Sequence, residues 1–182
     1  MLIAQQKRKD NIAEYLLYMW QVEDIIRASQ LNIDTIEQTI LSKYNVSDEI
    51  RMQMRDWWES LIKMMQLENA QNGGHLQINK NVIIRLTDLH LSLLNNSQYP
   101  EYGADFYRTL PFIVELRSKS GNGEQAGELE TCFNALYGYL VLKLKGQEVS
   151  NGTATAMAQI SHFIGLLAAY YKKYETGTLK LD

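Results

Sequence analysis

The chain has 182 residues, of which 46% are hydrophobic and 21% are charged. These proportions are typical of a folded globular protein and exclude a disordered chain, and the length suffices for one domain with its own core. The formal net charge of −3 argues against a protein that binds nucleic acid mainly by neutralising phosphates. We therefore expect one domain over residues 1–182 and no nucleic-acid partner.

The apolar residues recur every three or four positions nearly throughout, and the chain has only two prolines. This pattern predicts an all-α protein, a helical bundle of about six to seven helices that ends in a long helical hairpin. The expected helices cover approximately residues 3–30, 34–43, 48–71, 79–95, 102–117, 128–145 and 153–174.

Polar and glycine residues mark several of the expected helix ends. Ser47 and Ser150 are predicted N-caps, and the sequence from Asn72 to Gly74 is predicted to stop the third helix. Pro111 lies inside the fifth segment, where either the helix kinks or Thr109 caps a new helix. Residues 118–127, which are rich in glycine and polar residues, are predicted to form a loop before the C-terminal hairpin.

Glu23 lies within the strongest apolar stripe of the first helix, between Leu16 and Ile26. A buried carboxylate without a partner costs several kcal/mol, so we expect it to be paired. Arg27, four residues further on, is the predicted partner on the same helix. A second partner is expected from another helix, with these candidates: the tyrosines and Arg8, Arg55, Arg85 and Arg108.

Two interpretations of Glu23 follow from this placement. In the first, Glu23 is a structural anchor that fixes the register of its helix. In the second, Glu23, Arg27 and Tyr18 border a polar pocket of a ligand-binding protein or an enzyme. We favour the structural anchor, because no catalytic motif accompanies the carboxylate.

Metal, thiol and cofactor chemistry find no support in the sequence. No histidine has a glutamate three residues before it, as a di-iron bundle requires. Cys132, the single cysteine, has the spacing of a buried helical residue and is expected to lie in the core. Trp57 falls on the apolar stripe of its helix, so we expect it in the core as well. We expect neither a metal nor a cofactor.

Arg85 and His90, in the segment RLTDLH, have a spacing that resembles the motif of HEPN-type metal-independent ribonucleases. The resemblance implies an all-helical, dimeric enzyme in which His90 is the acid–base and Arg85 binds the phosphate. Leu86 stands where the family usually has a polar residue after the arginine. A partly buried structural histidine is therefore the competing interpretation of His90.

Residues 1–28 and the segment LPFIVELRSK, together with the chain length, resemble a bacterial family classified only as a domain of unknown function. The resemblance covers nearly the whole chain and implies a small, helical, cytoplasmic protein without a defined activity. The N-terminal segment MLIAQQKRKD predicts neither a secretory signal nor a membrane span, which agrees with the cytoplasm and with no membrane partner.

Eleven tyrosines, seven methionines and three tryptophans favour contact surfaces over an assembled catalytic site. The leading hypothesis is a non-enzymatic protein that acts through contact with another protein or with itself, as in a homodimer. The alternatives are the pocket near Glu23, Arg27 and Tyr18, and the ribonuclease that uses Arg85 and His90.

Overall fold

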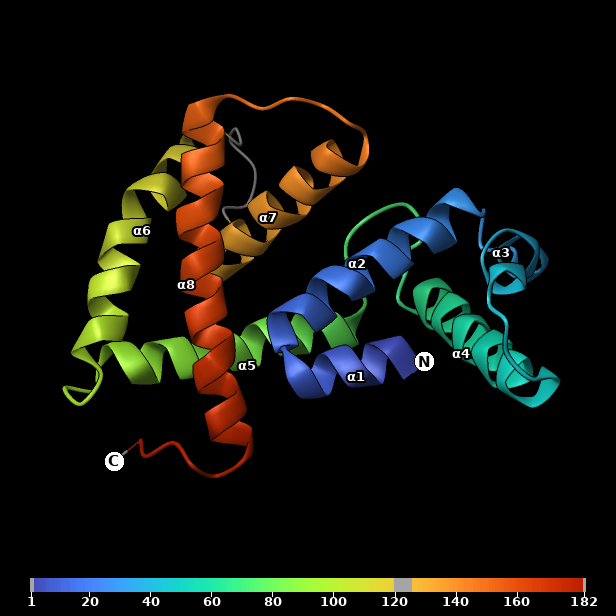
Figure 1. Cartoon of the computed structure of the whole chain (residues 1–182), viewed down its shortest axis with the longest axis horizontal. Helices are drawn as coiled ribbons and strands as arrows, with labels where there is room; N and C mark the ends of the chain where they lie inside the picture. The colour runs from blue at the N-terminus through green and yellow to red at the C-terminus, as the bar shows by residue number, and fades with distance from the viewer. Residues whose placement is uncertain (1, 120–125, 182) are drawn as a thin grey trace. The chain divides into compact units, whose positions relative to one another are not determined.

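Every regular element in the described part of the chain is a helix (Figure 1), which confirms the all-α prediction. The computed structural model describes residues 2–119 and 126–181. Within these ranges it has eight α-helices and a short 3₁₀ helix, η1, instead of the six to seven helices expected. The elements are α1 (Leu2–Asp10), α2 (Ile12–Ala28), α3 (Ile33–Thr39), η1 (Leu41–Lys43), α4 (Asp48–Leu67), α5 (Gln77–Leu94), α6 (Pro100–Lys119), α7 (Glu128–Leu144) and α8 (Asn151–Glu175).

The described residues form two compact units, each with its own apolar core. Unit 1 comprises residues 2–10 and 14–81, and unit 2 comprises residues 11–13, 82–119 and 126–181. The first residues of α5 belong to unit 1 and the rest of this helix to unit 2. The single domain expected over residues 1–182 stays a prediction.

In unit 1, α2 buries apolar side chains on several of its faces, including Leu16, Trp20 and Ile26. Helix α4 is more amphipathic and buries one stripe, which contains Trp58 and Met65. The stripe follows the 3.6-residue repeat, so only one side of α4 loses its contact with water. Trp57, expected in the core, is only half-buried, and Trp58 takes the core position instead.

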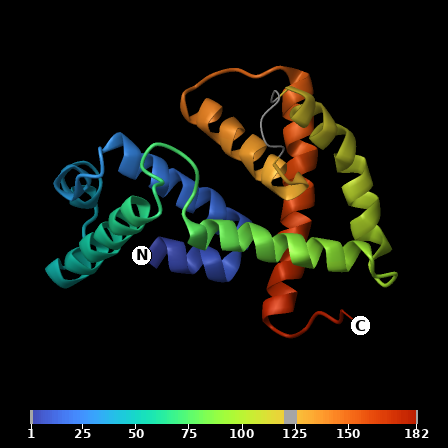
Figure 2. The ribbon, with the colours of Figure 1, turned by 180° about the vertical axis from the view of Figure 1, so that it is seen from behind.

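In unit 2, α8 lies between α6 and α7 in both views (Figures 1 and 2), and it contacts both helices. Its buried face includes Ile160 and Phe163, and the Phe163 ring packs on Phe106 of α6 with the ring centroids 5.6 Å apart. The expected C-terminal pair of helices is thus present. Ser150 caps α8 as predicted, because its hydroxyl accepts a hydrogen bond from the Thr153 N–H.

Two helix ends differ from the prediction for local reasons. The first helix divides into α1 and α2 at Asn11, whose side-chain oxygen accepts a hydrogen bond from the Ala13 N–H and begins a new helix. Helix α4 ends at Leu67, before the predicted Gly73 and Gly74. Asn69 adopts a left-handed conformation there, and the following N–H, of Ala70, bonds to the Met65 carbonyl and closes the helix.

Helix α6 continues through Pro111, so the predicted new helix with a Thr109 cap is wrong. The Thr109 hydroxyl instead donates to the Asp105 carbonyl one turn earlier in the same helix. Helix α6 also includes Ser118 and Lys119, so the predicted loop over residues 118–127 starts later than expected. Residues 120–125 of that loop lie outside the described residues.

Candidate functional site

Glu23 is fully buried in unit 1 and accepts three hydrogen bonds. Its Oε1 accepts from the Leu76 N–H at 2.9 Å and from the Asn79 amide at 2.7 Å. Its Oε2 lies 2.6 Å from the Nδ1 of His75, whose ring stacks on Trp20 with centroids 4.0 Å apart. Both oxygens are therefore satisfied without water, as a buried carboxylate requires.

These contacts place Glu23 at the N-terminus of α5, which begins at Gln77. The backbone N–H groups of a first helical turn have no partners within the helix and carry a partial positive charge. Glu23 accepts from one of them, and Glu68 accepts from the next, the Gln77 N–H, at 2.6 Å. Two carboxylates from α2 and from the end of α4 thus take the place of a cap on α5.

The predicted ion pair between Glu23 and Arg27 is wrong. Arg27 instead pairs with Asp24 at 2.9 Å and donates to the carbonyls of Ala70 and Gly74. Its guanidinium thereby fastens the segment between α4 and α5 to α2. Since Glu23 is already bonded on both oxygens and Arg27 binds backbone carbonyls, these contacts match the structural anchor expected of Glu23.

His75 and Asn79 were missed by sequence reasoning, because neither follows an apolar periodicity that points to Glu23. One signal was present. The chain enters α5 through Leu76, which has no side-chain oxygen to accept from the first turn. A helix that begins in this way and is partly buried requires an acceptor from elsewhere in the fold.

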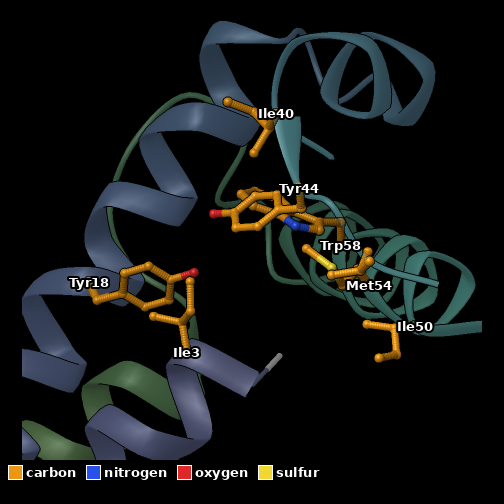
Figure 3. A pocket seen from close by; sticks show the side chains of 8 residues that line it. Ile3, Tyr18, Ile40, Tyr44, Ile50, Met54 and Trp58 are labelled. Carbon is orange, nitrogen blue, oxygen red and sulfur yellow. The ribbon is translucent and has the colours of Figure 1, made fainter. Parts of the chain in front are cut away.

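Tyr18, the third predicted ligand-binding residue, does line a cavity of about 90 Å³ in unit 1. We call this cavity the tyrosine pocket (Figure 3). Its walls come from α1, α2, α4 and the segment between α3 and α4. The lining residues are Ile3, Tyr18, Ile40, Tyr44, Val46, Ile50, Met54 and Trp58.

The two tyrosines supply two hydroxyl groups to a largely apolar pocket, which Trp58 also lines. Figure 3 shows their hydroxyl groups pointing toward one another from opposite walls. Burial raises the pKa of Tyr18 to about 12, and the nearby Tyr44 adds to this shift. Tyr18 therefore keeps its proton at physiological pH and offers both a donor and an acceptor to a group that enters the pocket.

Arg85 and His90 are not brought together by the structure. Arg85 lies on the exposed side of α5, whereas His90 is 2% exposed within unit 2. The Nδ1 of His90 lies 2.6 Å from the Tyr102 hydroxyl, and the ring packs on Phe106 and Phe163. Burial lowers the pKa of His90 to about 4. This geometry matches a structural histidine and gives no support to the ribonuclease hypothesis.

Cys132 is fully buried, and burial raises the pKa of its thiol to about 12, so it is protonated and inaccessible at neutral pH. Among residues 2–119 and 126–181, no three His, Cys, Asp or Glu side chains gather in an arrangement that would hold a metal ion. Within the same ranges, no helix is both long and apolar enough to cross a membrane.

We expect replacement of Glu23 by glutamine to lower the free energy of unfolding by about 1–3 kcal/mol, since the neutral amide loses charge-assisted hydrogen bonds at the start of α5. Urea unfolding measures the change. Glu14, exposed on the same helix, is the matched control, and its replacement by glutamine is expected to change stability by less than about 0.5 kcal/mol. Equal losses in the two variants would contradict the anchoring role.

A second prediction concerns alkaline pH. An unfolded chain ionises Tyr18 near the ordinary value of 10.0, whereas the folded protein holds the proton until about pH 12. The folded state then binds more protons, so this contribution to stability is complete below pH 10 and is lost as the pH rises to 12. Tyr18→Phe removes the ionisable hydroxyl and with it this pH-dependent contribution to stability. The difference in unfolding free energy between wild type and variant should change over this range, and a constant difference would refute the assignment.

Comparison with known proteins places the chain in a family. No curated protein and no solved structure matched it. The family model described as "Domain of unknown function (DUF4924)" matches residues 1–178, nearly the whole length. The expected resemblance to a family without an assigned activity is confirmed, and the chain belongs to the DUF4924 family.

Proposed function

We propose that this protein is a cytoplasmic, non-enzymatic binding protein that acts through protein–protein contact, and that the tyrosine pocket receives an aliphatic side chain of its partner. The observation that carries the proposal is an apolar cavity with two tyrosine hydroxyls directed toward one another. An apolar site with few, convergent polar groups is the usual form of a binding pocket.

The size of the pocket favours a side chain over a whole metabolite. Its volume of about 90 Å³ is below the ~150 Å³ of a cavity that accepts benzene and well below the ~300–1,000 Å³ of most small-molecule sites. The volume of a leucine or isoleucine side chain is of the same order as that of the pocket. Ile3 and Tyr44, 40% and 37% exposed, contribute apolar surface that the partner would cover around it.

The hydroxyls of Tyr18 and Tyr44 favour a peptide over a plain hydrocarbon. Among the described residues, neither hydroxyl has a hydrogen bond with another side chain or with the backbone. Buried or half-buried hydroxyls gain from a partner. A peptide segment supplies one, because the backbone N–H and C=O groups beside the anchoring side chain both form hydrogen bonds.

The probe for this site is N-acetyl-leucine N-methylamide, which presents one aliphatic side chain between two peptide groups. We expect it to shift the Met54 methyl resonance saturably in the millimolar range, whereas the alanine analogue does not, because a methyl group leaves most of the pocket empty. Tyr18→Phe should weaken binding about 3- to 10-fold through the lost hydrogen bond. The measurement is a ¹³C-methyl NMR titration.

Tyr107→Phe, on an exposed tyrosine of unit 2, is the matched control and should bind the leucine probe as the wild type does. The proposal fails if the leucine and alanine probes shift Met54 equally, or if neither does. It also fails if the two tyrosine variants lose the same affinity.

Self-association is a second candidate function, favoured by the exposed face of α5 in unit 2. Ile84 and Leu91 are 53% and 50% exposed, lie seven residues apart on one face, and both line a groove of about 280 Å³. In an antiparallel pair of α5 helices, Ile84 of each copy meets Leu91 of the other, and Arg85 lies beside Asp88 of the second copy. The face thus pairs apolar with apolar residues and opposite charges across a two-fold axis, as an isologous interface requires.

Light scattering across a concentration series tests this second candidate. We expect the wild type to reach twice the mass of one chain and Ile84→Glu to remain a monomer, because a carboxylate facing Leu91 of the second copy is desolvated without a partner. Val114→Glu, at a position 57% exposed on α6, is the control and should dimerise. A monomeric wild type, or equal dissociation of both variants, would exclude this interface.

A further inference from the structure

A second and larger cavity of unit 1 has a volume of about 320 Å³, at the lower end of the range of small-molecule sites. We call it the arginine pocket. Its principal walls are Arg8 of α1, Tyr15 and Met19 of α2, and Trp57, Ser60 and Leu61 of α4. It shares no lining residue with the tyrosine pocket. Trp57 lines the arginine pocket, whereas its neighbour Trp58 lines the tyrosine pocket.

In the arginine pocket, the buried lining residues are mainly apolar, and polar groups lie at the exposed mouth. Met19, Leu61 and Tyr15, which are 2%, 3% and 7% exposed, form its base. Arg8 and Ser60 lie on exposed positions and bring a cation and a hydroxyl to its mouth. This gradient suits an amphipathic molecule whose apolar body enters first and whose polar head stays at the rim.

The charge at the mouth is positive and not neutralised. The guanidinium of Arg8 lies over the Tyr15 ring, 5.6 Å from its centroid. No carboxylate of the described chain lies within 4 Å of it, and none of the lining residues is acidic. The acidic neighbours are engaged elsewhere: Glu14 pairs with Lys7, and Asp10 accepts a hydrogen bond from Gln6.

We propose that the arginine pocket binds a small carboxylic acid with an aromatic or branched apolar body. The carboxylate would accept hydrogen bonds from Arg8, whose planar guanidinium matches its two oxygens. The apolar body would lie against Trp57, Met19 and Leu61. The half-buried indole of Trp57 supplies a flat wall for a ring. This inference does not depend on the partner proposed for the tyrosine pocket.

The probes are 3-phenylpropionate and 3-phenylpropanamide, which have the same apolar body and differ in the charge of the head group. Binding is followed by the indole N–H resonance of Trp57, assigned by its loss in Trp57→Phe. We expect the acid to bind at least 10-fold more tightly than the amide, and added salt to reduce this preference. Arg8→Met should abolish the preference, because it weakens binding of the acid much more than binding of the amide.

Lys9→Met is the matched control, because it removes the same charge from an exposed position on the same helix that does not line the pocket. It should keep the preference for the acid. The proposal is overturned if the acid and the amide bind equally, or if neither shifts the Trp57 indole N–H resonance. It is also overturned if Lys9→Met reduces the preference for the acid as much as Arg8→Met does. Since Met54 reports on the tyrosine pocket and Trp57 on the arginine pocket, failure at one site is distinguishable from failure at the other.

Discussion

The carboxylate of Glu23 at the N-terminus of α5 is the interaction on which the arrangement of unit 1 depends. It joins α2 to the segment that leads into α5 through His75, Leu76 and Asn79. A charge with no access to water is stable only where several donors converge on it, so within unit 1 the position of the first turn of α5 relative to Glu23 is tightly restricted. Arg27 supports the same segment by binding two of its carbonyls.

The two cavities of unit 1 follow from the way in which α4 packs. Its buried stripe holds the helix in unit 1, and Trp58 and Leu61 of this stripe, together with half-buried and exposed residues beside it, line the two cavities. One hollow is small, largely apolar and bordered by two tyrosine hydroxyls, and the other is larger and has a cation at its mouth. Because the chemistry at the two mouths differs, neighbouring pockets on one helix are suited to different occupants.

In unit 2, several residues of types that can act in catalysis hold structural positions. His90, Tyr102 and Cys132 lie in an aromatic core, where burial favours the neutral form of each. Asp105 is also buried, and it accepts hydrogen bonds from Arg108 of its own helix and from Gln159 of α8. The pair of His90 and Tyr102 joins α5 to α6, and the pair of Asp105 and Gln159 joins α6 to α8.

Local patterns in the sequence were sufficient to predict the helical class, the Ser150 cap and the burial of Glu23. Each of these features depends on residues within a few positions of one another. The partners of Glu23 were not predictable in this way, since His75 and Asn79 lie more than 50 residues away. Nor was the pocket around Tyr18, which joins four segments of the chain. The apolar repeat predicts which face of a helix is buried. Only the tertiary packing determines which helix covers that face and where a cavity remains.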